Sequence, residues 1–430
     1  MDTTINYLKD YVGQEVRLSG WLYNKRSSGK IRFLLVRDGT GLVQCIMAKG
    51  EVPDATFELS DSLTQESSLK VTGTVRVEPR SPGGFELGLT NIEIVQIAEP
   101  YPITKKEHGV DFLHDLRHLW LRSSRQYAIM KIRNEVIWAI REFFYNRGFV
   151  LIDSPILTAA IGEESSSLFE TEYFKMGKAY LAQTGQLYIE AACMSLRNVF
   201  CFGPTFRAEK SLTRRHLTEF WMVEGEMAYC DAEGSMKIQE EMVSYAAQAI
   251  LKKCRPELEK LERDITKLET ILPPFPRVDY GDAVKILQEH GSSITWGTDL
   301  GAEDETILSN MHDRPVFITN YPKRAKAFYM KENPANTETV LCADLLASEG
   351  YGEIIGGSQR EDNYDKLLAR IREEKLPEAA YGWYLDLRKY GSVPHSGFGL
   401  GIERTVTWLA GIHHIREAIP FPRMITRLYP

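Results

Sequence analysis

The chain has 430 residues, of which 43% are hydrophobic and 26% charged, and its formal net charge is -7. This length suits two or three domains that each bury a core. We find no signal-peptide pattern and no apolar run of about 18 residues, which excludes a membrane protein and favours a cytoplasmic one. The acidic balance excludes binding of nucleic acid through a broad basic surface, so any such contact is local and selective. The six cysteines form no CxxC pair, so neither a zinc ribbon nor a redox motif is indicated.

Residues 15–97 alternate between apolar and polar side chains with the period of two that is typical of strands. We predict five strands, at residues 16–22, 31–39, 42–48, 69–78 and 85–95. Asp38-Gly39 and the Pro-Gly-Gly of 82–84 lie where hairpin turns are needed. Five such strands fit an OB-fold β-barrel over residues 1–98. The strands alone leave open whether this barrel binds a nucleic acid or is only structural.

A different pattern follows the barrel. Residues 99–125 begin with EPYPITKKEHG, whose two prolines and weak periodicity predict a linker. Between 129 and 144 apolar residues recur at three- and four-residue steps. This spacing predicts an amphipathic helix that ends near Gly148 and is followed by a strand and Pro155. The charged run at 252–269 predicts a solvated helix.

Strand-like runs return at residues 180–226 and 327–404, at longer range than a series of hairpins. They predict a mainly antiparallel sheet flanked by helices, so we expect the whole chain to be an α+β protein. We assign residues 126–430 to this second domain. Within it, we expect residues 250–330 to form a less regular, insertion-like part.

Two stretches combine an arginine with a glutamate. FRAE contains Arg207 and Glu209, and GFGLGIER, residues 397–404, ends in Arg404. Such a pair is usually a surface ion pair. However, two separated arginines in apolar sequence need anionic partners, because a guanidinium cannot discharge itself. The glycine spacing of GFGLGIER does not match the dinucleotide fingerprint, so we expect its glycines to let a strand and a helix pack closely rather than to cradle a phosphate.

Together these stretches resemble the signature motifs of a known family. The helix and strand that end at Pro155, then FRAE with EFWMVEGE, then GFGLGIER resemble the three ordered motifs of the class II aminoacyl-tRNA synthetases. The barrel in front is similar to that of the aspartyl, asparaginyl and lysyl subgroup. The resemblance covers nearly the whole chain. It implies a homodimer built through the first motif, a catalytic sheet of six or seven antiparallel strands, and a barrel that reads a tRNA anticodon.

The resemblance implies an ATP site. It assigns Arg207 to the α-phosphate and the amino-acid carboxylate, and Arg404 to the γ-phosphate and one face of the adenine. These two are the expected catalytic residues, since a fixed cation suits a reaction in which a carboxylate attacks a phosphate. The other expected ATP contacts are Glu209 and Phe220 at the adenine, Arg215 and His216 at the γ-phosphate, and Glu353 through a metal ion.

A magnesium site is implied by ADLLASEGYGEIIGGSQR, residues 343–360. Asp344 and Glu353 flank an apolar segment in which carboxylates need partners, and Mg²⁺ that bridges ATP oxygens is such a partner. In the family the acids that match these two positions bind the metal, with a serine like Ser358 nearby. From the residues alone, Asp344 could instead belong to a solvated turn.

The amino-acid pocket distinguishes close relatives. Aspartyl enzymes carry a lysine at the position of Ile189, so the cation that would neutralise aspartate is missing here. Glu224 and Arg360 match residues around the substrate side chain, and an acceptor beside a donor fits the carboxamide of asparagine. Glu163 and Gln186 are expected to receive the α-ammonium group. The chain departs from the family pattern in GEESSS, where a second glutamate replaces the usual glycine of this loop.

In the barrel, the resemblance assigns the anticodon contacts to Arg26, Phe33, Gln44 and Glu86. Phe33 and Gln44 match residues that stack on and hydrogen-bond the central uridine, which is the usual chemistry for splayed bases. Phe33 lies in a predicted strand, so burial in the barrel core is the alternative.

The resemblance thus predicts ATP-dependent ligation of asparagine to tRNA(Asn) through an aminoacyl adenylate, with release of AMP and pyrophosphate. Three alternatives stay open. A compact aspartyl enzyme is disfavoured by Ile189 and Glu224, and an ATP-dependent asparagine-forming ligase is disfavoured by the barrel, which its relatives lack. A non-catalytic RNA-binding paralogue is disfavoured by the intact Arg207, Glu353 and Arg404.

Overall fold

The computed structural model describes residues 1–159 and 167–430. The chain divides into two compact units, Met1–Val110 and Asp111–Pro430, which are described separately below. None of the helices in the described ranges is long and apolar enough to cross a membrane.

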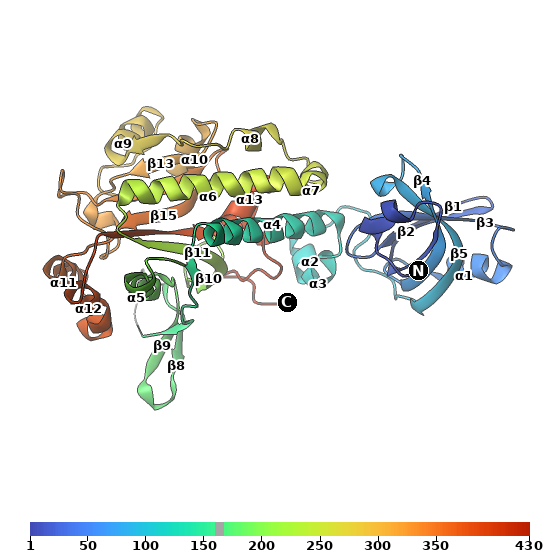
Figure 1. Ribbon diagram of the computed structural model, residues 1–430, viewed down its shortest axis with the longest axis horizontal. Helices are drawn as coiled ribbons and strands as arrows, with labels where there is room; N and C mark the ends of the chain where they lie inside the picture. The colour runs from blue at the N-terminus through green and yellow to red at the C-terminus, as the bar shows by residue number, and fades with distance from the viewer. Residues whose placement is uncertain (160–166) are drawn as a thin grey trace. The chain divides into compact units, whose positions relative to one another are not determined.

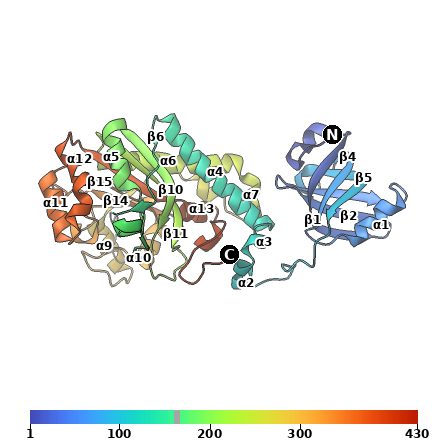
Figure 2. The same cartoon turned by 90° about the horizontal axis from the view of Figure 1, so that it is seen from below.

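The first unit is a closed β-barrel with the strand order β1-β2-β3-β5-β4. Its strands are β1 (Glu15–Ser28), β2 (Ile31–Arg37), β3 (Leu42–Ala48), β4 (Ser68–Val77) and β5 (Phe85–Gln96). Buried and exposed side chains alternate as the sequence pattern requires; in β1, Val16, Leu18 and Leu22 are fully buried. The five predicted strands are therefore confirmed. Helix α1 (Asp54–Ser62), which the period-two pattern did not indicate, connects β3 to β4 (Figure 2).

The predicted linker is only partly without regular structure. Residues 97–109 contain no helix or strand, whereas α2 (Val110–Asp115) and α3 (Arg117–Trp120) follow them. Arg117 is buried and donates hydrogen bonds to the backbone carbonyls of Ile419 and Pro420. The second half of the predicted linker therefore packs within the second unit.

The second unit is built on an eight-stranded sheet with the order β12-β13-β14-β15-β16-β11-β10-β6. In that order the strands are β12 (Arg277–Asp279), β13 (Val316–Thr319), β14 (Cys342–Ala347), β15 (Gly352–Gln359), β16 (His395–Gly401), β11 (Glu219–Ala228), β10 (Asn198–Phe206) and β6 (Val150–Leu151). The pairs β12–β13 and β10–β6 at the two edges are parallel, and the pairs between them are antiparallel. The α+β prediction is confirmed. The sheet has eight strands rather than six or seven, because the short β12 and β6 extend an antiparallel centre.

Three helices cover one face of this sheet (Figure 1): α4 (Ser124–Asn146), α6 (Ala232–Lys253) and α13 (Ile402–Leu409). Ser123 caps α4, since its side-chain oxygen accepts from the Gln126 amide. The predicted apolar stripe of α4 packs with strand residues such as Val223 and Leu400 in one hydrophobic core. The predicted amphipathic helix is confirmed.

The remaining helices are α5 (Gln186–Leu196), α7 (Arg255–Lys260), α8 (Thr266–Glu269), α9 (Tyr280–Glu289), α10 (Ala302–Asn310), α11 (Tyr364–Glu373) and α12 (Gly382–Lys389). The charged run 252–269 is divided among the end of α6, α7 and α8, and it buries Leu258 and Leu268 completely. A single solvated helix was therefore a wrong prediction. The segment 250–330, expected to be less regular, supplies β12 and β13 to the sheet. Leu258 and Leu268 are buried by contacts with distant parts of the chain. The density of charges along the sequence does not reveal such contacts.

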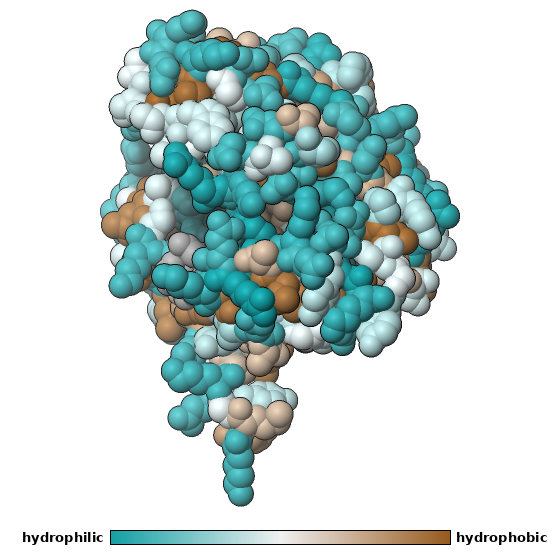
Figure 3. Space-filling view, turned by 90° about the vertical axis from the view of Figure 1, so that its left-hand side faces the viewer, coloured by the Kyte–Doolittle hydropathy of each residue, from teal (hydrophilic) through white to brown (hydrophobic). Residues whose placement is uncertain are grey.

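A small sheet consists of β7 (Leu157–Thr158), β9 (Lys178–Leu181) and β8 (Glu170–Glu172). In Figure 3 the β8–β9 hairpin forms the narrow extension below a face that is covered mostly by hydrophilic residues. Phe174 and Met176, between these two strands, are strongly exposed.

Candidate active site

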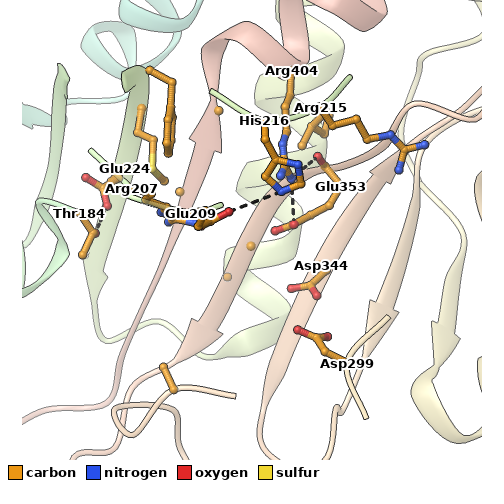
Figure 4. Close-up of a pocket in the computed structure, with 18 of the residues that line it drawn as sticks. Thr184, Arg207, Glu209, Arg215, His216, Glu224, Asp299, Asp344, Glu353 and Arg404 are labelled. Atoms are coloured by element: carbon orange, nitrogen blue, oxygen red, sulfur yellow. Dashed lines mark hydrogen bonds and ion pairs between the residues drawn. The ribbon is translucent and has the colours of Figure 1, made fainter. Parts of the chain in front are cut away.

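Most of the predicted ATP and amino-acid contacts line one cavity on the face of the main sheet opposite α4, α6 and α13. Strand pairing aligns four residues of neighbouring strands in one row: Glu224, Gly399, Gly356 and Asp344. Their sequence neighbours Val223, Leu400, Ile355 and Leu345 point to the hydrophobic core on the other face, as strand alternation requires. The row forms the floor of a cavity of about 430 Å³ (Figure 4).

The glycines of GFGLGIER make room for side chains of the neighbouring strand. A Cβ at Gly397 would collide with the Glu226 carboxylate, and one at Gly399 would collide with the side chain of Met222. A Cβ at Gly401 would have only ordinary contacts, all with Arg404. The glycines therefore serve contact between β16 and β11 rather than the close packing of a strand and a helix that we expected.

Four predicted nucleotide contacts line the cavity together: Arg207, Glu209, His216 and Phe220. The guanidinium carbon of Arg207 lies 5.5 Å from the centre of the Phe220 ring. His216 Nε2 lies 3.5 Å from the Glu209 carboxylate (Figure 4). Burial and the nearby Arg404 lower the pKa of His216, so its imidazole is neutral near pH 7 and can exchange hydrogen bonds with a ligand.

Arg215 lines the same cavity but its guanidinium points away from His216 (Figure 4). It donates to the carboxylate of Glu305 at 3.0 Å and to the backbone carbonyl of Gly350 at 2.6 Å. Glu305 also accepts from the backbone amide of Glu353. The predicted γ-phosphate contact is thus held by protein acceptors that sequence analysis did not identify.

Asp344 and Glu353 face the cavity from β14 and β15. A Cβ at Gly356 would lie 3.1 Å from Glu353 Oε1 and 3.7 Å from Asp344 Oδ1, so the two carboxylates converge on one region. Each is paired with a cation, Asp344 with Lys326 at 2.7 Å and Glu353 with Arg404 at 3.0 Å. Burial raises the pKa of Asp344 to about 7; Lys326 opposes this rise and Glu353 adds to it. The solvated-turn alternative for Asp344 is wrong because the residue is buried.

Ser358 is not brought to the two carboxylates. It lies in the next row of paired residues, with Glu226 and Gly397. Its hydroxyl accepts from Arg360 at 2.9 Å. Asp344 and Glu353 offer the convergent carboxylate oxygens that Mg²⁺ prefers, whereas the serine serves another part of the site.

Glu224 is buried at the opposite end of the row from Asp344. Its carboxylate accepts from the Thr184 hydroxyl, from the Gly185 amide at 2.7 Å and from the Cys201 thiol at 3.2 Å. These three donors fix the orientation of the carboxylate. Gln186 also lines the cavity, where α5 begins.

Arg360 is buried and lines the cavity beside Tyr329, whose ring centre lies 5.3 Å from its guanidinium carbon. Glu226 pairs with it at 2.9 Å. Burial would lower the pKa of Arg360, but the carboxylates of Glu226 and Glu190 outweigh burial and raise it. Glu226 was not among the predicted residues, although strand alternation places it on the same face as Glu224.

Ile189 is fully buried in an apolar cluster with Cys193, Val199 and Cys201. The position at which aspartyl enzymes carry a lysine is therefore part of an uncharged core. Glu163, the other predicted ligand of the α-ammonium group, lies outside the residues that the structure describes.

The four predicted anticodon contacts lie on neighbouring strands of the barrel. The guanidinium carbon of Arg26 lies 4.1 Å from the centre of the Phe33 ring, and Arg26 Nη2 donates to Gln44 Oε1 at 3.3 Å. Glu86 is paired with Gln44 across β3 and β5. Phe33 is half-buried and lies outside the buried barrel core, so the core alternative is wrong.

Comparison with known families agrees with both units. The family described as "tRNA synthetases class II (D, K and N)" matches residues 110–425, and an OB-fold nucleic acid binding domain matches residues 16–95. The chain belongs to the class II tRNA synthetases of this group. The barrel is an OB-fold.

Solved class II synthetases are similar to the chain over its full length. The crystal structure of asparaginyl-tRNA synthetase from Pyrococcus horikoshii complexed with asparaginyl-adenylate has a TM-score of 0.97 and 47% identity, and the match covers 100% of both chains. The Entamoeba histolytica asparaginyl-tRNA synthetase in complex with asparaginyl-adenylate has a TM-score of 0.91 and 30% identity, also over 100% of both chains. The aspartyl tRNA synthetase from the same organism has a TM-score of 0.84 and 25% identity, over 100% of this chain and 93% of that one.

In this class II synthetase one cavity brings together most of the predicted site: Arg207, Glu209, Arg215, His216, Phe220, Gln186, Glu224, Arg360, Asp344, Glu353 and Arg404. Lys326 and Glu305 line it as well and were missed. Both lie outside the three motifs, in segments whose charges have no informative spacing. Glu305 lies on α10 and Lys326 in the loop before β14, so only the tertiary structure brings them to the site.

Proposed function

We propose that this chain ligates L-asparagine to tRNA(Asn) in two steps. The carboxylate of asparagine attacks the α-phosphorus of ATP, which forms asparaginyl adenylate and releases pyrophosphate. A terminal ribose hydroxyl of the tRNA then takes the acyl group and releases AMP. The similarity to two synthetase structures that contain asparaginyl-adenylate supports this function.

The charge balance around Glu224 is the observation that favours asparagine over aspartate as the substrate. Glu224 offers an acceptor for the NH2 of a carboxamide, and Arg360 offers a donor for its oxygen. The charge of Arg360 is already balanced by Glu226 at 2.9 Å, and Ile189 is apolar. An aspartate side chain would therefore meet the Glu224 carboxylate beside an arginine whose charge is already balanced, which opposes its binding.

The ATP end of the cavity supports the activation step. Arg207 can hold the α-phosphate and the substrate carboxylate with two parallel donors, which offsets the charge that develops as the two anions meet. Phe220 and Arg404 suit the two faces of the adenine, and Glu209 suits its amino group. No side chain needs to act as a covalent nucleophile, because positioning and charge stabilisation are sufficient for this transfer.

We further infer that Asp344 and Glu353 would hold a Mg²⁺ ion beside the ATP site. The convergence of their oxygens near Gly356 supports this assignment. When bound, the ion supplies positive charge to the phosphates. Lys326, paired with Asp344 at 2.7 Å, holds that carboxylate toward the cavity.

We also infer a homodimer formed through α4 and the edge strand β6. Large apolar side chains of this region are exposed, including Trp138 at 59% and Tyr145 at 80% on α4 and both residues of β6, Val150 and Leu151. An open sheet edge beside apolar surface is suited to association with a second copy.

We propose that the barrel reads the anticodon through the cluster around Phe33. The cytoplasm is the expected compartment.

A charging assay tests the proposed function. The protein is incubated with ATP, Mg²⁺, tRNA and either labelled asparagine or labelled aspartate, and the acid-precipitable label is counted. Asparagine should be charged and aspartate should not. Charging with aspartate alone would indicate an aspartyl enzyme. In a parallel reaction with labelled aspartate, ATP and ammonia, free labelled asparagine would indicate an amide-forming ligase. The absence of both activities would indicate a non-catalytic RNA-binding protein.

A further inference from the structure

A fully buried group of charges lies behind the amino-acid end of the cavity. It consists of Glu190 on α5, Glu226 on β11, Arg360 after β15, Arg388 on α12 and His395 on β16. Their side chains are at most 3% exposed. The formal charges of the two carboxylates and the two guanidinium groups balance each other. This balance matters because buried charges are costly unless they are paired.

Glu190 is the centre of this network. Its carboxylate accepts from Gln186 Nε2 at 3.0 Å, the Tyr384 hydroxyl at 2.8 Å, Arg388 at 2.9 Å and His395 Nε2 at 3.0 Å. Burial would raise the pKa of Glu190, but Arg388, His395 and Arg360 outweigh burial and lower it. Glu190 is therefore ionised at neutral pH.

Two further contacts connect Glu190 to Arg360. The Nε atom of Arg360 lies 4.0 Å from Glu190 Oε1. Arg388, which Glu190 binds, also donates through Nε to the backbone carbonyl of Glu361 at 2.8 Å, and Glu361 directly follows Arg360. The charge of Glu190 thus attracts the Arg360 guanidinium. Through Arg388, Glu190 also fixes the backbone next to Arg360.

We infer that Glu190 is a positioning residue that links the two ends of the amino-acid pocket. It holds Gln186, which faces the α-ammonium group, and it stabilises the orientation of Arg360, which faces the side chain. This inference rests on the proposed function, since it concerns how asparagine is bound. Glu190 does not touch the substrate; it acts through two residues that do.

A metal-binding role for the same residues is disfavoured by their contacts. Ligand atoms of Glu190, Glu226 and His395 lie within 4.8 Å of one another, which is a spacing that could hold a metal ion. However, Arg360 pairs with Glu226 and Arg388 pairs with Glu190, each at 2.9 Å. Unlike Asp344 and Glu353, these carboxylates are fully buried and do not line the cavity, so the network has no room for a further cation and is better suited to fix the arginines.

The inference is tested by steady-state pyrophosphate exchange with Glu190→Gln and Tyr384→Phe. Glu190→Gln keeps the side-chain size but removes the charge, so the KM for asparagine should rise about tenfold or more while the KM for ATP changes less than about twofold. Tyr384→Phe removes only the hydroxyl that donates to Glu190, so it should raise the KM for asparagine about two- to fivefold. This milder change carries the test if Glu190→Gln does not fold.

Glu240→Gln is the matched control. Glu240 is a buried carboxylate on α6 that accepts from the Phe275 amide at 2.9 Å and does not line the cavity. Both KM values of this variant should equal those of the wild type. An unchanged KM for asparagine in both test variants, or an equal rise in both KM values, would overturn the inference. Absence of asparagine-dependent exchange in the wild type would instead overturn the proposed function.

Discussion

Arg404 and Glu353 form an ion pair in which one guanidinium nitrogen, Nη1, lies 3.0 Å from both the carboxylate and the backbone carbonyl oxygen of Glu353. The pair joins the first turn of α13 to β15. The arginine proposed to contact ATP and the carboxylate proposed to hold magnesium therefore form one unit. A change in either residue should affect the other.

Replacing Glu353 should disable nucleotide activation. Glu353→Gln removes a metal ligand and the counter-charge of Arg404, so the rate of asparagine-dependent pyrophosphate exchange should fall by about 100-fold or more. Glu349→Gln is the control, because Glu349 pairs with Arg263 outside the cavity. If the exchange rate of the Glu353 variant were within about threefold of the control rate, Glu353 would have no part in the proposed mechanism.

Replacing Arg207 should abolish adenylate formation without unfolding the protein. The Arg207→Ala variant loses the bidentate cation between the α-phosphate and the carboxylate, and we expect exchange activity below about 1% of wild type. Arg207 is only half-buried, so the thermal midpoint should stay close to that of the wild type. Normal exchange in this variant would contradict the assignment.

Replacing Glu224 should weaken discrimination against aspartate. In Glu224→Gln the negative charge that repels an aspartate side chain is removed, so the ratio of kcat/KM for asparagine to that for aspartate should fall by about tenfold or more. The absolute activity should also fall, because the Gly185 amide and the Thr184 hydroxyl lose a charged acceptor. An unchanged ratio would show that Glu224 does not set the specificity.

Elements of the fold could be predicted where the pattern of their buried residues is local in the sequence. The five barrel strands show a period of two and α4 shows helical spacing, so both could be predicted. The helix predicted for 252–269 was wrong, because Leu258 and Leu268 are buried by contacts with distant segments. The strands β12 and β13 were missed for the same reason.

The candidate site was predictable where motifs carry it. Arg207, Glu353 and Arg404 come from recognisable stretches, and the cavity brings them together. Lys326 lines the cavity from the loop before β14, and Glu190 on α5 contacts Arg388 of α12 behind the cavity. Neither could be found in this way, because contacts between distant segments place them there. The role of Gly397 was also visible only from strand register, which sets it opposite Glu226.

The barrel should act in the tRNA step alone. Phe33→Ala removes a ring that Arg26 covers at 4.1 Å, and we expect kcat/KM for tRNA to fall by about tenfold, since stacking of one base contributes about 1–3 kcal/mol. Pyrophosphate exchange without tRNA should be unchanged. Trp21→Ala is an aromatic control elsewhere on the barrel surface, where Trp21 contacts Arg37. An equal loss in both variants would argue against a specific anticodon contact at Phe33.

His114 should make the second unit acid-sensitive. The residue is 1% exposed, and burial together with Arg117 lowers its pKa from an ordinary value of 6.5 to about 3. The folded state therefore keeps His114 neutral, whereas the unfolded chain takes up a proton below pH 6.5. The stabilising contribution is complete above pH 6.5 and is lost as the pH falls toward 3, by about 3 kcal/mol at pH 4.

The measurement for His114 is urea unfolding of the wild type and His114→Phe at pH 7.5 and pH 4.5. The variant keeps a ring beside Trp120, which contacts His114 edge to face. Between the two pH values the wild type should lose about 2–3 kcal/mol more stability than the variant. Equal losses would mean that His114 is already protonated in the folded protein at pH 4.5.

Direct competition between the two amino acids is the sharpest test of the proposed specificity. The protein is supplied with ATP, Mg²⁺, tRNA and equal concentrations of asparagine and aspartate, and the aminoacyl-adenosine released by ribonuclease is identified by mass spectrometry. The charge balance around Glu224 and Arg360 predicts asparaginyl-adenosine in excess of about 100-fold. Aspartyl-adenosine as the main product would contradict the assignment of this pocket to asparagine.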